Sequence, residues 1–321
     1  MTSPGLLLAG AAATWLATGL LLGLARTRGW GKAVRRDGPS GHLAKEGTPT
    51  LGGVGFVVIA LVLGAAALLA GGTAVAPPGA DAPATPADRW AVLALVAASA
   101  ALGLWDDRTS LRRARRAAEG DEGTTGVLAR WRILAQGVAG LAFGAWAVSQ
   151  GHAMLGPAWL DVLAFAFVVV GSVNALNFTD GLDGLAAGTA AVMLLAFWGD
   201  PFAAALMGGL LGFLWFNAHP ARLFMGGVGA EALGAAIAGL AIVHGDVWRL
   251  PILALVPVAE VLSVIVQVSV FRLANGRRLL RMSPLHHHFE LIGWPETRVV
   301  ARFWLMTAAT TVLAIWSRAW W

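Results

Sequence analysis

Two adjacent carboxylates, Asp106 and Asp107, directly follow an apolar stretch at residues 89–105. Neighbouring carboxylates at such a boundary are costly unless they meet a cation, a proton or a basic partner. They could bind a phosphate that carries magnesium, or act as a base, because magnesium prefers one or two carboxylates together with phosphate oxygens. They could equally form a solvated helix end that Arg112 and Arg113 neutralise.

A second polar segment follows the apolar stretch at residues 158–176. Residues 174–183 contain two asparagines, a threonine and two aspartates, among them Asn177, Asp180 and Asp183. Asp180 and Asp183 are three residues apart and would share one face of a helix. A turn alone explains so dense a group of amide and carboxylate side chains poorly, so we expect a functional site here.

Two glycine-containing segments could approach an anionic ligand. Residues 45–53 read KEGTPTLGG, and residues 216–229 read FNAHPARLFMGGVG. Glycine allows close backbone approach, and a glycine-rich turn that opens a helix can present N–H groups to phosphate. Each pattern is weak alone, because ordinary turns and closely packed membrane helices also use glycine. The candidate residues in these segments are Lys45, Thr50, Asn217, Phe224 and Gly226.

Three consecutive histidines, His286, His287 and His288, lie in the last polar loop. Consecutive residues cannot easily ligate one ion together, and the chain has no cysteine to help. Imidazoles that contact phosphates therefore fit better than a soft-metal site. Glu260 and Gln267 precede this loop and fall roughly on one helix face. They could line the same site, or they could hold helices together.

The elements that position these groups must lie in a membrane. Of 321 residues, 57% are hydrophobic and only 13% are charged, with a mean hydropathy of +0.70. A soluble domain needs more charge on its surface. The net charge of +5 is too small to favour nucleic acid as a partner, even with a pI of about 11.1. The absence of cysteine excludes disulfides, thiolate metal sites and cysteine nucleophiles.

A transmembrane helix needs about 20 mostly apolar residues, and about ten such stretches occur along the chain. The sequence therefore predicts an all-α, polytopic membrane protein with a single integral-membrane domain over residues 1–321. The expected spans are residues 5–25, 52–71, 89–105, 132–149, 158–176, 184–199, 202–217, 229–244, 250–271 and 299–317.

The basic residues indicate the orientation of these spans. Of the 23 lysines and arginines, 19 lie in loops that follow odd-numbered spans, and the exceptions are Arg89, Arg249, Arg302 and Arg318. The positive-inside rule places those loops in the cytoplasm and both termini outside. The candidate site residues lie mostly on the same cytoplasmic loops.

These motifs together resemble one known family. GTPTLGGV, the Asp106–Asp107 pair, NALNFTDGLDGLAAG, FNAHPARLFMG and SPLHHHFELIGWPETRVVARFW occur in the order and loop positions of the phospho-N-acetylmuramoyl-pentapeptide transferases. The resemblance covers nearly the whole chain, and its last motif is the most specific.

The resemblance implies a magnesium-dependent enzyme of the bacterial inner membrane, active at the cytoplasmic face and usually a homodimer. Such an enzyme transfers phospho-MurNAc-pentapeptide from UDP-MurNAc-pentapeptide to undecaprenyl phosphate within the lipid bilayer, giving lipid I and UMP. This step belongs to peptidoglycan synthesis and so to cell wall biogenesis, cell shape and cell division.

The resemblance also implies roles for individual residues. The catalytic group would be Asp106, Asp107, Asp180, His286 and His287. The substrate-binding group would be Lys45, Thr50, Asn177, Asp183, Asn217, Phe224, Gly226, Gln267 and His288. Phe224 would stack on uracil, and Asn177 is a candidate metal ligand.

One departure from the family concerns its metal. The family has an aspartate, its magnesium ligand, where this chain has Gly227. Glycine offers only backbone atoms, and Glu231, four residues on, is expected to fall short. The family's lysine after the aspartate pair is also missing, and Arg132 stands where the family usually has a lysine.

Three alternatives remain open beside lipid I synthesis. A related transferase could use a UDP-N-acetylhexosamine for another cell-surface polymer. A catalytically impaired relative could bind nucleotide without turnover, which Gly227 would explain. A transporter would place its polar residues near the midplane of the membrane, whereas these motifs gather at one face.

Overall fold

The computed structural model describes residues 2–28, 45–72, 84–118 and 126–319. Every regular element in these ranges is a helix, which confirms the all-α class. Five helices are long and apolar enough to cross a membrane, and four shorter apolar helices accompany them. The polytopic membrane architecture is confirmed.

Each expected span overlaps a helix in the described part of the chain. Span 184–199 continues from an α-helix into a short 3-10 helix, and span 250–271 is divided at Ala254. The helices are α1 (Ser3–Thr27), α2 (Gly53–Leu69), α3 (Pro86–Ala118), α4 (Gly126–Ser149), α5 (Ala158–Thr179), α6 (Leu185–Met193), η2 (Leu194–Phe197), α7 (Pro201–Asn217), α8 (Gly227–Val243), η3 (Val247–Arg249), α9 (Leu250–Leu253), α10 (Leu255–Leu273), α11 (Leu285–Leu291) and α12 (Glu296–Ser317).

Helix α8 forms the centre of the bundle. Every residue from Val228 to Val243 is buried, and the helix packs against α2, α3 and α5. A helix that is apolar or small on all sides is one that other helices surround. The first turn of α8 therefore occupies a fixed place, around which the site residues are arranged.

Glycines allow α3 to approach this first turn closely. A β-carbon on Gly103 would lie 2.4 Å from the carbonyl oxygen of Gly227, so only glycine fits at that point of α3. Small residues at helix contacts are the usual way for membrane helices to come together. The Asp106–Asp107 pair follows in the next turn of α3, which places it beside the start of α8.

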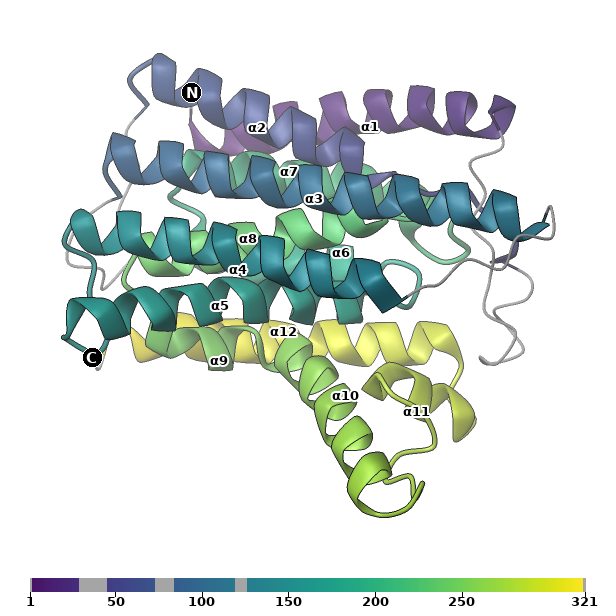
Figure 1. The fold of residues 1–321 in the computed structure, drawn as a ribbon. Helices are drawn as coiled ribbons and strands as arrows, with labels where there is room; N and C mark the ends of the chain where they lie inside the picture. The colour runs from purple at the N-terminus through teal and green to yellow at the C-terminus, as the bar shows by residue number, and fades with distance from the viewer. Residues whose placement is uncertain (1, 29–44, 73–83, 119–125, 320–321) are drawn as a thin grey trace.

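Helix α10 diverges from the other helices and projects from the side of the bundle, as Figure 1 shows. The short helix α11, which the sequence pattern did not predict, lies between α10 and α12 and packs against both. The two termini lie toward the same end of the bundle (Figure 1). The loops that carry the candidate site residues lie at the other end.

Candidate functional site

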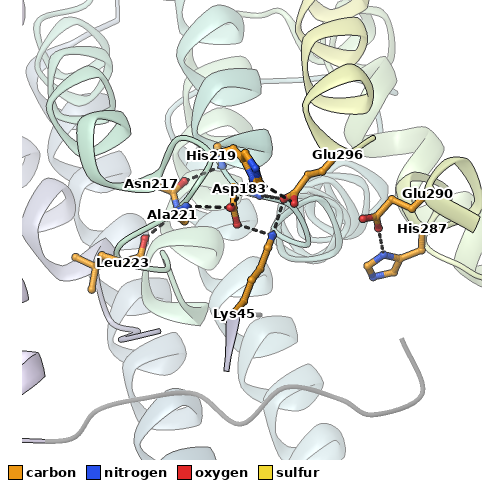
Figure 2. A network of polar contacts seen from close by, with 10 residues as sticks. Lys45, Asp183, Asn217, His219, Ala221, Leu223, His287, Glu290 and Glu296 are labelled. Carbon is orange, nitrogen blue, oxygen red and sulfur yellow. Dashed lines mark hydrogen bonds and ion pairs between the residues drawn. The ribbon is translucent and has the colours of Figure 1, made fainter. Parts of the chain in front are cut away.

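A cluster of charged side chains from distant segments lies where α12 begins (Figure 2). The ammonium group of Lys45 lies 2.7 Å from Oδ1 of Asp183 and 2.6 Å from Oε1 of Glu296. Lys45 and Glu296 are 251 residues apart in sequence. The Asp183 side chain is only 2% exposed. One ammonium group thus pairs with two carboxylates that are largely shielded from water. Buried carboxylates require such a positively charged partner.

The second oxygen of Asp183 faces the turn after α7. Oδ2 accepts a hydrogen bond from the backbone N–H of Ala221 at 2.9 Å and lies 3.1 Å from Nδ1 of His219. The same imidazole nitrogen lies 3.4 Å from Oε2 of Glu296. Asp183 is therefore the centre of the cluster, held by an ammonium, an imidazole and a backbone donor (Figure 2).

Asn217 joins two of the predicted motifs. Its Oδ1 accepts the backbone N–H of Gly184 at 3.2 Å, and its Nδ2 donates to the carbonyl of Leu223 at 3.0 Å. Gly184 has a φ of +77°, a conformation that side chains other than glycine rarely adopt. Asn217 consequently fixes the DGLDG segment against the turn that leads to α8.

Asp183, His219 and Glu296 offer three ligand atoms within 4.8 Å of one another, so they could hold a metal ion. The ammonium of Lys45 already contacts two of their oxygens. Magnesium also prefers ligand sets made only of oxygen. The triad therefore suits the ammonium group of Lys45 better than it suits magnesium.

Asp107 caps the first turn of α8. Its Oδ1 accepts the N–H of Gly227 at 2.9 Å, and its Oδ2 accepts the N–H of Val228 at 3.0 Å. A carboxylate at a helix N-terminus is favourable because the unpaired N–H groups carry partial positive charge. Asp106 instead pairs with Arg132, with 3.2 Å between Oδ2 and Nη1. The two adjacent aspartates thus have different partners.

Gly226 fits between Asp107 and Thr50. It has a φ of +78°, and a β-carbon there would lie 2.7 Å from Oδ2 of Asp107 and 3.0 Å from Oγ1 of Thr50. Phe224 pairs through its backbone with the segment before α2, donating to Pro49 at 2.8 Å and accepting from Gly52 at 2.9 Å. Backbone hydrogen bonds therefore join the two glycine-containing segments beside α8.

His286 joins the histidine motif to the aspartate motif. The ring is buried against Gly181, where an added β-carbon would lie 2.1 Å from its Nε2. Its Nδ1 lies 3.1 Å from Oε2 of Glu260 on α10. Glu260 also accepts from the backbone N–H of His286 at 3.2 Å. The ring therefore lies beside the residue that follows Asp180.

The other candidate residues in and before the histidine motif contact their own loop. Gln267 accepts from the N–H groups of Leu279 and Leu280, and its amide donates to the carbonyl of Leu280. His287 lies 2.8 Å from Glu290, and His288 accepts from the N–H of Arg281. Gln267 and His288 shape the loop with these atoms, and Figure 2 draws the His287–Glu290 pair apart from the Lys45 cluster.

Asn177 and Asp180 lie at the end of α5. Asn177 is in its last turn, Asp180 is the C-cap, and both are partly buried. Gly181 and Asp183 connect them to His286 and to the Lys45 cluster. The structure thus brings the predicted motifs to one end of the bundle.

Three acidic or histidine residues of the site were given no role from sequence: His219, Glu290 and Glu296. His219 and Glu296 lay inside recognised motifs, and a glutamate directly after proline is typical of a helix start. Their shared partner, Asp183, could be found only from the fold.

The fold is that of a polytopic, all-α membrane protein, and comparisons with known proteins give its class. The model of glycosyl transferase family 4 matches residues 89–245. The chain is 43% identical to the phospho-N-acetylmuramoyl-pentapeptide-transferase of Deinococcus radiodurans, over 94% of this chain and 96% of that one. It is 44% identical to the protein of the same name from Deinococcus deserti, over 97% and 98%. The corresponding Moorella thermoacetica protein is 44% identical over 86% of each chain.

The protein is thus a membrane phosphoglycosyl transferase. More closely, the chain belongs to the phospho-N-acetylmuramoyl-pentapeptide transferase family.

Proposed function

We propose that this protein transfers phospho-MurNAc-pentapeptide from UDP-MurNAc-pentapeptide to undecaprenyl phosphate, giving lipid I and UMP for peptidoglycan synthesis. The names of its relatives support the donor. The observation that carries the proposal is the convergence of Lys45, Asp183, His219 and Glu296 from four segments into one charged cluster. This cluster contacts the turn between α7 and α8, through the N–H of Ala221, and that turn leads to the start of α8 that Asp107 caps.

In this reaction an oxygen of the lipid phosphate attacks the sugar-bearing phosphorus of the donor. The bond from that phosphorus to the bridging oxygen breaks, and UMP leaves. Such a transfer depends mainly on positioning and charge neutralisation. Lys45 would contact the diphosphate, and Phe224 would stack on uracil beside Asn217. His286, whose ring lies against Gly181, and His287 would contact phosphate oxygens near Asp180.

Asp106, Asp107 and Asp180 would lie along the phosphates, one of them as a candidate base. Asp107 accepts two backbone N–H bonds from the first turn of α8, one with each carboxylate oxygen. We therefore assign Asp107 mainly to positioning the first turn of α8. Asp106 and Asp180 remain the candidates for contact with the lipid phosphate.

Magnesium is the proposed cofactor, and the available donors suit it. Asp106, Asp180 and the amide oxygen of Asn177 are oxygen ligands, as this ion prefers. When bound, the ion would neutralise charge on the diphosphate. Gly227 supplies no side chain toward it, so we expect the substrate phosphates to provide most of its ligands.

We further propose that the site faces the cytoplasm, that both termini lie outside, and that the protein is a homodimer in the bacterial inner membrane. The distribution of basic residues supports the orientation. The termini toward one end of the bundle agree with an even number of spans (Figure 1).

The nucleotide product tests the reaction type. Purified protein in lipid nanodiscs, given UDP-MurNAc-pentapeptide, undecaprenyl phosphate and magnesium, should release UMP. A reaction without the lipid phosphate is the control. Release of UDP would mean that the bond between sugar and oxygen breaks, and the proposal would then be wrong.

Gly227 favours one second candidate, a relative that binds the donor without transfer. Calorimetric titration with UMP separates the two. Binding of UMP without product at any magnesium concentration would support the impaired relative, whereas product formation would rule it out.

A further inference from the structure

A chain of buried polar side chains leads from the site into the bundle. Glu231, one turn past Gly227 on α8, is completely buried. Its Oε2 accepts from Nε2 of Gln136 on α4 at 3.2 Å. Oε1 of Gln136 in turn accepts from Nδ2 of Asn174 on α5 at 2.8 Å. The amide of Gln136 is thereby oriented to donate to Glu231, as a carboxylate at that place requires.

Arg132 connects this chain to the aspartate pair. Its Nε faces Oε1 of Glu231 at 4.0 Å, and its Nη1 binds Oδ2 of Asp106 at 3.2 Å. The side chains of Arg132 and Asp106 are each 23% exposed, whereas that of Glu231 is inaccessible. The guanidinium group therefore extends from a buried carboxylate to a partly exposed one.

The burial of Glu231 has a physical cost. A carboxylate enclosed in a membrane helix bundle is expensive unless it is paired, so such residues usually have a function. Within the described residues, neither Oε1 of Glu231 nor Nε of Arg132 has a hydrogen-bond partner. Their mutual attraction is the interaction that remains for these two atoms, and it draws the guanidinium group inward.

We propose that Glu231 is a positioning residue for the transfer reaction, acting through Arg132 on Asp106. Glu231 anchors one edge of the guanidinium group, and the other edge then holds Asp106 in a fixed orientation at the site. Without the buried charge, Arg132 would be free to move toward substrate phosphates, and Asp106 would lose its defined direction. This inference rests on the proposed function.

Glu231→Gln tests the proposal, because it keeps the side-chain shape and an acceptor for Gln136 but removes the charge. We expect kcat for lipid I formation to fall at least about tenfold, with KM for the donor changed by less than about threefold, as for a group that acts in the transition state. In an Arg132→Gln background, Glu231→Gln should lower kcat no further, because Glu231 acts on Asp106 only through the guanidinium group that is then missing.

Asp200→Asn is the matched control. Asp200 is buried at the N-terminus of α7, where its side chain accepts from the backbone N–H groups of Phe202 and Ala203 and so caps the helix. Its loss should lower the thermal midpoint and leave kcat unchanged. A fall in kcat for this variant equal to that of Glu231→Gln would reduce Glu231 to a structural residue and overturn the proposal.

Two other results would overturn it: an unchanged kcat in Glu231→Gln, or a full additional loss in the Arg132→Gln background. Lack of transfer by the unaltered chain would instead count against the proposed function. In that case a double-mutant cycle on thermal unfolding decides whether Glu231 acts on Arg132. Additive effects of Glu231→Gln and Arg132→Gln would overturn the inference, and clear coupling would support it.

Discussion

Asp107 on α3 accepts a hydrogen bond from the backbone N–H of Gly227, the first residue of α8, at 2.9 Å. A β-carbon on Gly227 would lie 3.3 Å from the same carboxylate oxygen. An aspartate at position 227 would thus project beside Asp107, and the two carboxylates together would favour a divalent cation. With glycine there, Asp107 caps the start of α8 through the N–H groups of Gly227 and Val228.

We predict that Gly227→Asp raises transfer activity and lowers the magnesium concentration needed for half-maximal rate. The added carboxylate supplies a charged oxygen where the family has its metal ligand. A magnesium titration of the transfer rate measures both effects, with Gly227→Asn as the uncharged control. Full activity of the unaltered chain at low magnesium, with no gain in the variant, would mean that other residues hold the ion.

Gly226 and Gly227 should differ sharply in their tolerance of a side chain. Gly226→Ala forces a β-carbon against Asp107 and Thr50 at a positive φ, whereas Gly227→Ala needs shifts of only a few tenths of an ångström. We expect the first variant to lose UMP affinity and thermal stability, and the second to keep both. Calorimetry and thermal unfolding would detect this, and equal behaviour would contradict the described turn.

Asp180→Asn keeps the shape of the side chain and removes its charge. If Asp180 contacts the reacting phosphates, turnover should fall at least about tenfold, or about 1.4 kcal/mol of barrier, with a smaller effect on UMP binding. Asp107→Asn should lower turnover as well and also destabilise α8, since one of its two accepting oxygens is lost. Unchanged turnover in both variants would place the reaction centre elsewhere.

The orientation is testable because the chain has no cysteine. Ser110→Cys, in the last part of α3, and Ala153→Cys, between α4 and α5, introduce single exposed thiols at opposite ends of the bundle. With the site in the cytoplasm, an impermeant maleimide should label only Ala153→Cys in intact cells and both variants in broken cells. Labelling of Ser110→Cys alone in intact cells would mean that the site faces outward and that the proposed orientation is wrong.

Hydropathy was sufficient to predict the apolar helices, because a buried or lipid-facing helix must be apolar over its length. It could not predict the break at Ala254, since the residues on both sides are apolar. Hydropathy does not indicate where one helix ends and the next begins in another direction. Pro251 and Pro257 were a usable signal, because proline suits the first turn of a helix and those turns belong to α9 and α10.

The site was predictable as a set of motifs but not as a set of contacts. Polar residues at the ends of apolar stretches identified Asp107 and Asp183. Nothing local indicates that Asp107 caps α8 or that Lys45 meets Glu296, because such long-range pairs depend on how the helices pack. Glu231 was expected to fall short of the site, and the structure gives it a partner, Arg132, that links it to Asp106.

Donor choice tests the proposed function most directly. Purified protein in nanodiscs would receive undecaprenyl phosphate, magnesium over a wide concentration range, and either radiolabelled UDP-MurNAc-pentapeptide or radiolabelled UDP-N-acetylglucosamine. We predict label in the lipid product from the first donor only, rising with magnesium up to unusually high concentrations because Gly227 provides no ligand. Transfer from UDP-N-acetylglucosamine with none from UDP-MurNAc-pentapeptide would contradict the proposed function.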